Sequence, residues 1–127
     1  MDASQAQDWL NRYIEAWRTG DRPLIGDLFS EETRYRYHPY DKPMSGRQAV
    51  VQSWLEDEDP TQEWEADYQV FAVEGDRMVA TGTSRYLPSR DHEEQIYHNV
   101  FLVEFDDEGR CREFTEFFVQ EPLPGSA

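Results

Sequence analysis

The chain has 127 residues, of which 12 are basic and 27 acidic, and its formal net charge at neutral pH is −15. This length suits one domain built around one core. So strong a negative charge repels phosphate backbones and anionic lipids, which argues against nucleic acids and membranes as partners.

The cysteine content and the amino-terminal segment further restrict the class of protein and its compartment. The single cysteine, Cys111, cannot form an intramolecular disulfide and leaves no CxxC site for a metal or for redox chemistry. The first nine residues have neither a basic region nor an apolar run, so no secretory signal is expected. No apolar stretch reaches the roughly 18 residues that a membrane span needs. We therefore expect a soluble protein of the cytoplasm.

Three helices are expected in the first half of the chain. Ser4, with a glutamine three residues later, has the spacing of a capping box, apolar residues follow at helical intervals, and Gly20 supplies the stop. Asp21 caps a short second helix that has a proline in its first turn. Ser45, again with a glutamine three residues later, begins a third helix near position 46.

Strands dominate the second half. A short strand over Thr33–Tyr37 comes before the third helix and is ended by the prolines at 39 and 43. Beyond residue 60 the apolar period changes to two, which predicts four long strands: Trp64–Val73, Arg77–Leu87, Gln95–Phe105 and Arg110–Gln120. The acidic run EDEDP at 56–60 is expected to be a solvated loop, and residues 121–127 a loose tail beyond an ordered core of about 5–120.

This order of elements predicts an α+β fold, because the helices come first and a long, mostly antiparallel sheet follows. One face of such a sheet must be buried, and the amphipathic helices are the elements available to cover it. A curved sheet beneath helices encloses a pocket. We therefore expect a single cone-shaped domain over residues 1–127, with amino-terminal helices packed on the curved sheet.

Four stretches of the chain resemble a known family. They are W-x-x-x-Y-x-x-A-W-R-T-G-D (9–21), Y-x-x-x-P-x-x-x-P-x-x-G-R (35–47), Y-H-N-V-F (97–101) and G-R-C-R-E-F-T-E (109–116). Together with the element order, they resemble the nuclear-transport-factor-2-like cone fold, and within it the SnoaL-like branch named for a polyketide cyclase. Members of this fold include isomerases, dehydratases, epoxide hydrolases, cyclases and pure binding modules. The resemblance therefore implies a fold and does not imply one reaction.

Strand alternation assigns side chains to the pocket. In a strand, every second residue faces the same way, so Tyr86, Asn99 and Glu116 can share the inner face of the sheet as its polar set. Small residues on the second long strand, at 80, 82 and 84, are expected to leave room for a cavity. The remaining wall residues that we expect are Phe101 and Phe114 from the strands, with Trp17, Tyr35, Tyr37 and Trp54 from the helices and the first strand.

Glu116 is the most informative acid. A carboxyl on an inward strand face among phenylalanines loses solvation, so its pKa should rise and it could shuttle protons at neutral pH. Tyr86 and Tyr35 could donate hydrogen bonds to a developing oxyanion, and Asn99 could orient a carbonyl or a water. The alternative is a structural acid held by an arginine or a tyrosine. Glu113 should face away, so no paired carboxylate is expected.

His38 is the second candidate, as a base at the mouth of the pocket. A histidine before a proline at a strand end can equally be a packed or half-exposed structural residue. The three histidines, His38, His92 and His98, are scattered and show no HxH or HExxH spacing, so no metal site is expected. The chain also lacks a nucleophile elbow, a glycine-rich phosphate loop and a dinucleotide fingerprint, so no cofactor is expected.

Three functions remain open at this stage. The first is a small-molecule enzyme that isomerises, dehydrates or cyclises a small apolar substrate, with Glu116 and Tyr86 handling protons. The second is a ligand-binding module without catalysis. The third is an interaction domain whose cone is filled by its own rings. Both faces of the last two strands carry apolar residues, so we also expect homodimerisation through the sheet.

Overall fold

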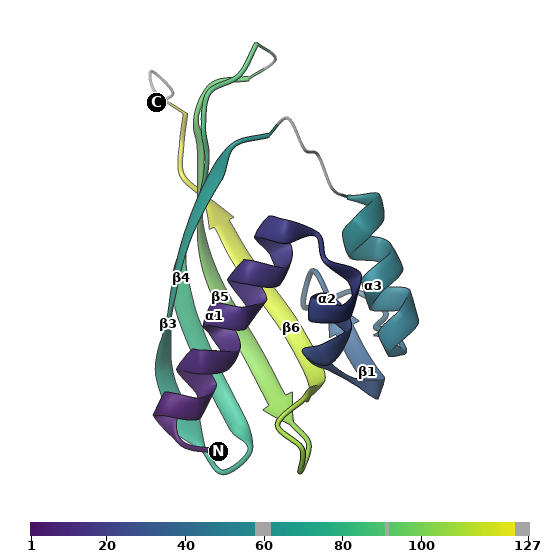
Figure 1. Ribbon diagram of the computed structural model, residues 1–127. Coiled ribbons are helices and arrows are strands. Elements are labelled where there is room, and N and C mark those ends of the chain that lie inside the picture. The colour runs from purple at the N-terminus through teal and green to yellow at the C-terminus, as the bar shows by residue number, and fades with distance from the viewer. Residues whose placement is uncertain (58–61, 91, 124–127) are drawn as a thin grey trace.

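A curved sheet and a layer of helices form the part of the chain that the computed structural model describes, namely residues 1–57, 62–90 and 92–123 (Figure 1). The helices are α1 (Ala3–Thr19), α2 (Arg22–Asp27) and α3 (Arg47–Glu56). The strands are β1 (Phe29–Arg36), β2 (Met44–Ser45), β3 (Trp64–Glu74), β4 (Arg77–Tyr86), β5 (Gln95–Phe105) and β6 (Cys111–Gln120). The helices lie on one face of the sheet, which confirms the α+β fold expected from the sequence.

The sheet is open, with its strands in the order β2-β1-β6-β5-β4-β3. Every neighbouring pair is antiparallel except β1 and β6, which run parallel. This parallel pair joins the strand from the first half of the chain to the last strand. It also explains why β1 begins at Phe29 rather than at the expected Thr33, because Phe29 is already in register with Cys111.

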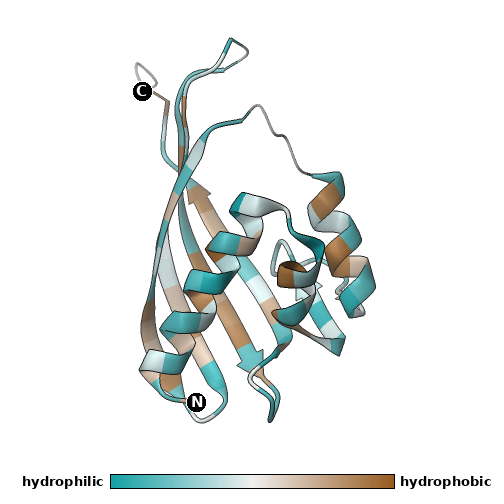
Figure 2. Cartoon of the chain, in the orientation of Figure 1, coloured by the Kyte–Doolittle hydropathy of each residue, from teal (hydrophilic) through white to brown (hydrophobic). Residues whose placement is uncertain are grey.

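Burial of one side of each helix holds the two layers together. Trp9 on α1 is fully buried, and its indole N–H donates to the Leu28 carbonyl oxygen at 3.1 Å. Its ring meets Phe105 of β5 nearly at a right angle, with the centroids 5.5 Å apart. Figure 2 shows apolar residues along β5 and β6 beneath α1, whose viewer-facing side is largely hydrophilic. Each such fully buried large apolar side chain stabilises the fold by about 1.5–3 kcal/mol.

The cap of α1 differs from the expected one. Asp2, not Ser4, is the N-cap, and its capping box is completed by Gln5. Gln7, the expected partner of Ser4, instead hydrogen-bonds the open edge of β3: its amide donates to the Tyr68 carbonyl and accepts from the Val70 N–H, both at 3.1 Å. The helix ends as expected, at Gly20 in the left-handed conformation.

The start of α3 also differs, whereas α2 begins as expected with the Asp21 side chain accepting from the Leu24 N–H. Gly46, not Ser45, is the N-cap of α3, and no side chain caps that helix. Ser45 is unavailable because it pairs with Arg34 in the β1–β2 ladder, which holds its backbone extended. A serine at the right spacing therefore became part of a strand.

Strand boundaries in the second half fall within one residue of the expected ones. Glu56 of the acidic run ends α3 and Asp57 follows it, while the rest of that run lies outside the described residues. In the expected loose tail, Glu121 is attached to the sheet: its N–H donates to the Ile96 carbonyl and its carboxylate meets the His98 imidazole at 2.6 Å. Positions 124–127 lie outside the described residues.

The described residues include no helix whose length and hydropathy would let it cross a membrane.

Candidate functional site

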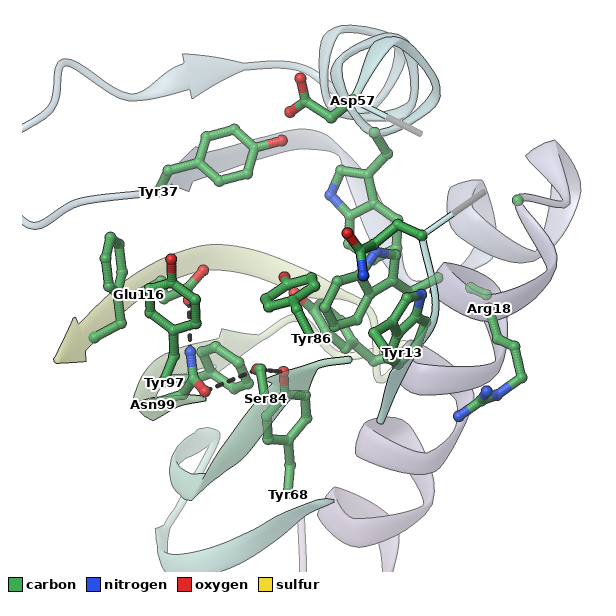
Figure 3. A pocket seen from close by; sticks show the side chains of 18 of the residues that line it. Tyr13, Arg18, Tyr37, Asp57, Tyr68, Ser84, Tyr86, Tyr97, Asn99 and Glu116 are labelled. Carbon is green, nitrogen blue, oxygen red and sulfur yellow. Dashed lines mark hydrogen bonds between the residues drawn. The ribbon is translucent and has the colours of Figure 1, made fainter. Parts of the chain in front are cut away.

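A cavity of about 650 Å³ lies between the inner face of the sheet and the helices (Figure 3). About half of the residues in its wall are aromatic, and many of these are tyrosines. The aromatic residues that line it are Tyr13, Trp17, Tyr35, Tyr37, Trp54, Trp64, Tyr68, Tyr86, Tyr97, Phe101 and Phe118. At one side Trp17 stacks on Trp64, with the ring centroids 4.0 Å apart, and the Arg18 guanidinium lies 4.6 Å from the Trp64 ring. An aromatic wall of this kind suits a small, largely apolar molecule.

Glu116 of β6 supplies the carboxyl of this cavity. One of its oxygens, Oε2, accepts a hydrogen bond from the Asn99 side-chain N–H at 2.9 Å. Burial raises the pKa of Glu116 from 4.5 to about 7, against the opposing effects of the Asn99 hydrogen bond and the positive charge of His38. Near neutral pH the carboxyl is therefore present in both protonation states, as proton transfer in either direction requires.

Three further side chains form a hydrogen-bonded chain that ends at this carboxyl. The Ser84 hydroxyl donates to the Asn99 side-chain oxygen at 2.8 Å, and the Tyr68 and Ser84 hydroxyls are 2.5 Å apart. Tyr68, Ser84 and Asn99 are all buried, so their polar atoms depend on one another for hydrogen bonds. Figure 3 shows the chain crossing the floor of the cavity from β3 to β6.

Two phenol hydroxyls face the same cavity without a hydrogen-bond partner among the described residues, those of Tyr86 and Tyr97. The two rings meet edge to face with their centroids 5.7 Å apart, and the Tyr86 ring centroid lies 6.4 Å from that of Trp17. Burial, with a smaller effect of the Glu116 charge, raises the pKa of Tyr86 to about 12. Tyr86 therefore stays neutral and can donate a hydrogen bond to an oxygen of a bound molecule.

The chain matches the SnoaL-like domain family over residues 10–114. It belongs to that family. A search of curated proteins finds no match.

Solved structures similar to this SnoaL-like chain have the nuclear-transport-factor-2-like fold. An NTF-2-like protein of unknown function from Burkholderia xenovorans LB400 has a TM-score of 0.71 at 16% identity, covering 96% of this chain and 89% of that one. The epoxide hydrolase/cyclase-like enzyme SalBIII, of pyran ring formation in polyether salinomycin, has a TM-score of 0.74 at 14% identity, covering 93% of each chain. An LEH-like epoxide hydrolase from M. tuberculosis has a TM-score of 0.68 at 11% identity, covering 92% and 84%. At these identities the likeness shows the fold.

Most of the site residues expected from the sequence of this SnoaL-like chain lie around the cavity. They are Trp17, Tyr35, Tyr37, Trp54, Tyr86, Asn99, Phe101 and Glu116. Strand alternation brought the strand members together, because β4, β5 and β6 are in register with the same face turned inward: Gly82 is opposite Asn99, and Asn99 is opposite Phe118.

Phe114 differs from that expectation. It faces inward but is fully buried beneath the cavity rather than lining it. The Tyr35 ring stacks on it, with the centroids 4.4 Å apart and the planes nearly parallel, and Tyr13 covers it from α1 at 5.7 Å. The side chains stacked above Phe114 therefore form the wall that we expected from Phe114 itself.

His38 lies in a neighbouring groove on the far side of Glu116 rather than among the residues that line the cavity. Its Nδ1 is 2.9 Å from the Asp41 carboxylate, and its ring stacks on Tyr40 at 5.2 Å. Asn99, Glu116 and Phe118 line both the groove and the cavity. His38 thus acts on Glu116 through its charge. Within the described ranges, no cluster of three or more His, Cys, Asp or Glu residues is arranged to hold a metal ion.

Gly82 of β4 has a different role from the expected one, whereas Ser84 lines the cavity. A Cβ at Gly82 would lie 2.0 Å from the Asp67 carbonyl oxygen and 2.6 Å from the Tyr68 ring, so the space above Gly82 is occupied by β3. Gly82 therefore permits the close approach of β3 that carries Tyr68 to Ser84. Sequence reasoning did not select Tyr68, Ser84 or Tyr97 as site residues, although period-two alternation places Ser84 on the same face as Tyr86 and Tyr97 on the same face as Asn99. Tyr68 lies on β3, from which no residue was selected.

Proposed function

We propose that this SnoaL-like chain catalyses proton transfer on a small, uncharged and largely apolar molecule, with Glu116 as the acid–base residue. Isomerases, dehydratases and cyclases all need a group that takes a proton at one point of the substrate and returns it at another. The observation that supports the proposal is a carboxyl with a pKa of about 7 in an aromatic cavity. A group with its pKa near the working pH is the most effective proton carrier.

Each polar group of the cavity has a separate role in this proposal. Among the described residues, no hydrogen bond occupies Oε1 of Glu116, so this oxygen can take a proton from the substrate while Asn99 holds Oε2. The Tyr86 hydroxyl donates to the substrate oxygen on which negative charge develops. When the carboxyl returns its proton to another substrate atom, the site is back in its starting state.

The charge and wall of the cavity indicate the substrate class. An ionised Glu116 repels an anionic substrate, and the tryptophan and tyrosine rings offer apolar faces to a ring system or a short carbon chain. The activities by which SalBIII and the LEH-like epoxide hydrolase are named fit acid–base chemistry on such molecules. Their identities of 14% and 11% limit that support to analogy.

A simple base-dependent probe tests the proposal without knowledge of the natural substrate. Nitrobenzisoxazole loses its ring C–H proton to a base, its N–O bond breaks, and the coloured cyano-nitrophenolate that forms can be followed by absorbance. We expect turnover that rises with pH around an apparent pKa of about 7. Glu116→Gln should lower kcat/KM by at least about 100-fold, the lower end of what a positioned base contributes.

Two controls separate catalysis from binding. Glu113→Gln removes the same charge from the outer face of the same strand and should leave turnover unchanged. Binding of nitroindazole, which has no N–O bond to break, should survive in Glu116→Gln when measured by calorimetry. Binding with no Glu116-dependent turnover would instead indicate a ligand-binding module. Failure of both probes to bind would refute an accessible cavity.

We also propose that the chain forms a homodimer through the outer face of its sheet. Leu102, Phe117 and Val119 on that face are 43%, 40% and 71% exposed, respectively. Val100 and Phe117 are cross-strand partners, so the exposed rings and branched side chains adjoin. Equilibrium sedimentation at micromolar concentration should show a dimer, and Phe117→Glu should shift it to the monomer. A monomeric unmodified chain would refute the proposal.

A further inference from the structure

The direction of each hydrogen bond in the Tyr68–Ser84–Asn99–Glu116 chain is fixed by the chemistry of its members. The Asn99 side-chain oxygen can only accept, so the single hydroxyl proton of Ser84 goes to it. The proton in the Tyr68–Ser84 hydrogen bond must then come from Tyr68. The Asn99 amide is thus anchored by its oxygen, and its NH2 group is the end left for Glu116.

We propose that Ser84 and Tyr68 are positioning residues that hold the Asn99 carboxamide with its NH2 toward Glu116 and so favour the ionised form of that carboxyl. Their importance for turnover rests on the proposed function, whereas their effect on Glu116 does not. If the Asn99 side-chain amide were flipped, its oxygen would face the Glu116 carboxylate and its NH2 would face Ser84. That arrangement suits a protonated Glu116, which can donate to the amide oxygen.

The surroundings of Tyr68 keep this chain in place. Tyr68 is 3% exposed and meets the Phe101 ring edge to face at 4.8 Å. The Gln7 side chain fixes the backbone at Tyr68 and just after it, through hydrogen bonds to the Tyr68 carbonyl and the Val70 N–H, and Gly82 lets β3 approach closely. The Tyr68 hydroxyl therefore has little freedom to leave Ser84. Its donation to Ser84 keeps the Ser84 proton directed at the Asn99 side-chain oxygen.

Other groups around Glu116 do not replace this control. The titratable side chains that interact electrostatically with it are Tyr13 of α1, Tyr35 of β1, Tyr37 and His38 in the segment after β1, Tyr68 of β3 and Tyr86 of β4. Burial raises the pKa of each of these tyrosines, so they remain neutral while Glu116 titrates. His38 lowers the pKa of Glu116, and its contribution can be removed separately by His38→Gln.

The test is the titration midpoint of Glu116 itself, which needs no substrate. The full chain is labelled with ¹³C in the glutamate carboxyl carbons, and the Glu116 signal is assigned by its loss in Glu116→Gln. We expect Ser84→Ala to raise the midpoint by up to about one pH unit, as when a hydrogen bond to a charged group is weakened. Ser84→Thr, which keeps the hydroxyl, should restore the original midpoint.

The shift of the Glu116 midpoint should be smaller for a residue farther along the hydrogen-bonded chain from Glu116. Tyr68→Phe leaves the Ser84 hydroxyl in place and should raise the midpoint less than Ser84→Ala does, and each shift should persist in a His38→Gln background. Thr83→Ala removes a hydroxyl from the opposite face of the same strand and should leave the midpoint unchanged. A thermal melt of each variant verifies folding; if Ser84→Ala fails to fold, the comparison of Tyr68→Phe with Thr83→Ala decides.

The outcomes separate this proposal from the proposed function. An unchanged midpoint in folded Ser84→Ala, or in Tyr68→Phe where that comparison decides, would overturn the positioning role whether or not the chain turns over nitrobenzisoxazole. An upward shift in a chain with no turnover would leave the positioning role in place and refute catalysis. With both roles correct, the pH at which turnover is half-maximal should move upward together with the Glu116 midpoint.

Discussion

Glu116→Gln should stabilise the fold above neutral pH while it removes the proposed activity. The pKa of Glu116 is raised by burial from 4.5 to about 7, so between these values the folded chain retains a proton that the unfolded chain has released. Stability therefore falls as pH rises through this window. At 1.36 kcal/mol per pKa unit, the full interval is about 3 kcal/mol. Glutamine keeps the shape of the side chain and removes the charge.

Urea unfolding of both proteins at a series of pH values measures this difference. We expect little difference near pH 4.5, and a gain that grows to about 3 kcal/mol by roughly pH 8. A gain of this size corresponds to a melting temperature higher by roughly 10 °C for a chain of this length. Glu113→Gln, on the outer face beside Arg34, should show no such gain, because exposed ion pairs contribute at most about 1 kcal/mol.

Two results would refute this reasoning. The first is a difference between wild type and Glu116→Gln that stays constant from pH 5 to 8, because burial would then not penalise the charge. The second is a Glu116→Gln protein that is less stable at pH 8, because the carboxylate would then stabilise the fold. Either result would also remove the observation that supports the proposed function.

Two further predictions concern the surroundings of Glu116. Gly82→Ala should destabilise the fold by about 3 kcal/mol in urea unfolding, because a Cβ would lie 2.0 Å from the Asp67 carbonyl oxygen; a loss below about 1 kcal/mol would show that β3 can move away without cost. His38→Gln should raise the ¹³C titration midpoint of Glu116, because the positive charge of His38 lowers the pKa of that carboxyl; an unchanged or lower midpoint would contradict this.

Capping-box spacing predicted the wrong N-cap where a residue of the motif was used in another contact. Ser45 and its glutamine have the spacing of a capping box, but the β1–β2 ladder uses Ser45 as a strand residue. Ser4 loses its expected partner because Gln7 hydrogen-bonds the edge of β3. In each case a contact with a strand overrode a local signal that the sequence alone could read.

The sequence by itself determined which strand residues share the inner face. The side-chain period of a strand is two, so Tyr86, Asn99 and Glu116 follow from alternation once the hairpin registers are set by the turns. The helices, the four long strands and the aromatic character of the interior follow from equally local rules of spacing and composition.

Only the tertiary structure decided which inward residues line the cavity and which lie beneath it. Phe114 and Glu116 alternate on one face, yet Tyr35 covers the first and leaves the second open to the cavity. The parallel pairing of β1 with β6 places Tyr35 opposite Phe114, and its register has no local signal in the sequence. Depth in a packed interior depends on such long-range contacts. For the same reason, the hydrogen-bonded chain to Glu116 became visible only when β3, β4, β5 and β6 were assembled.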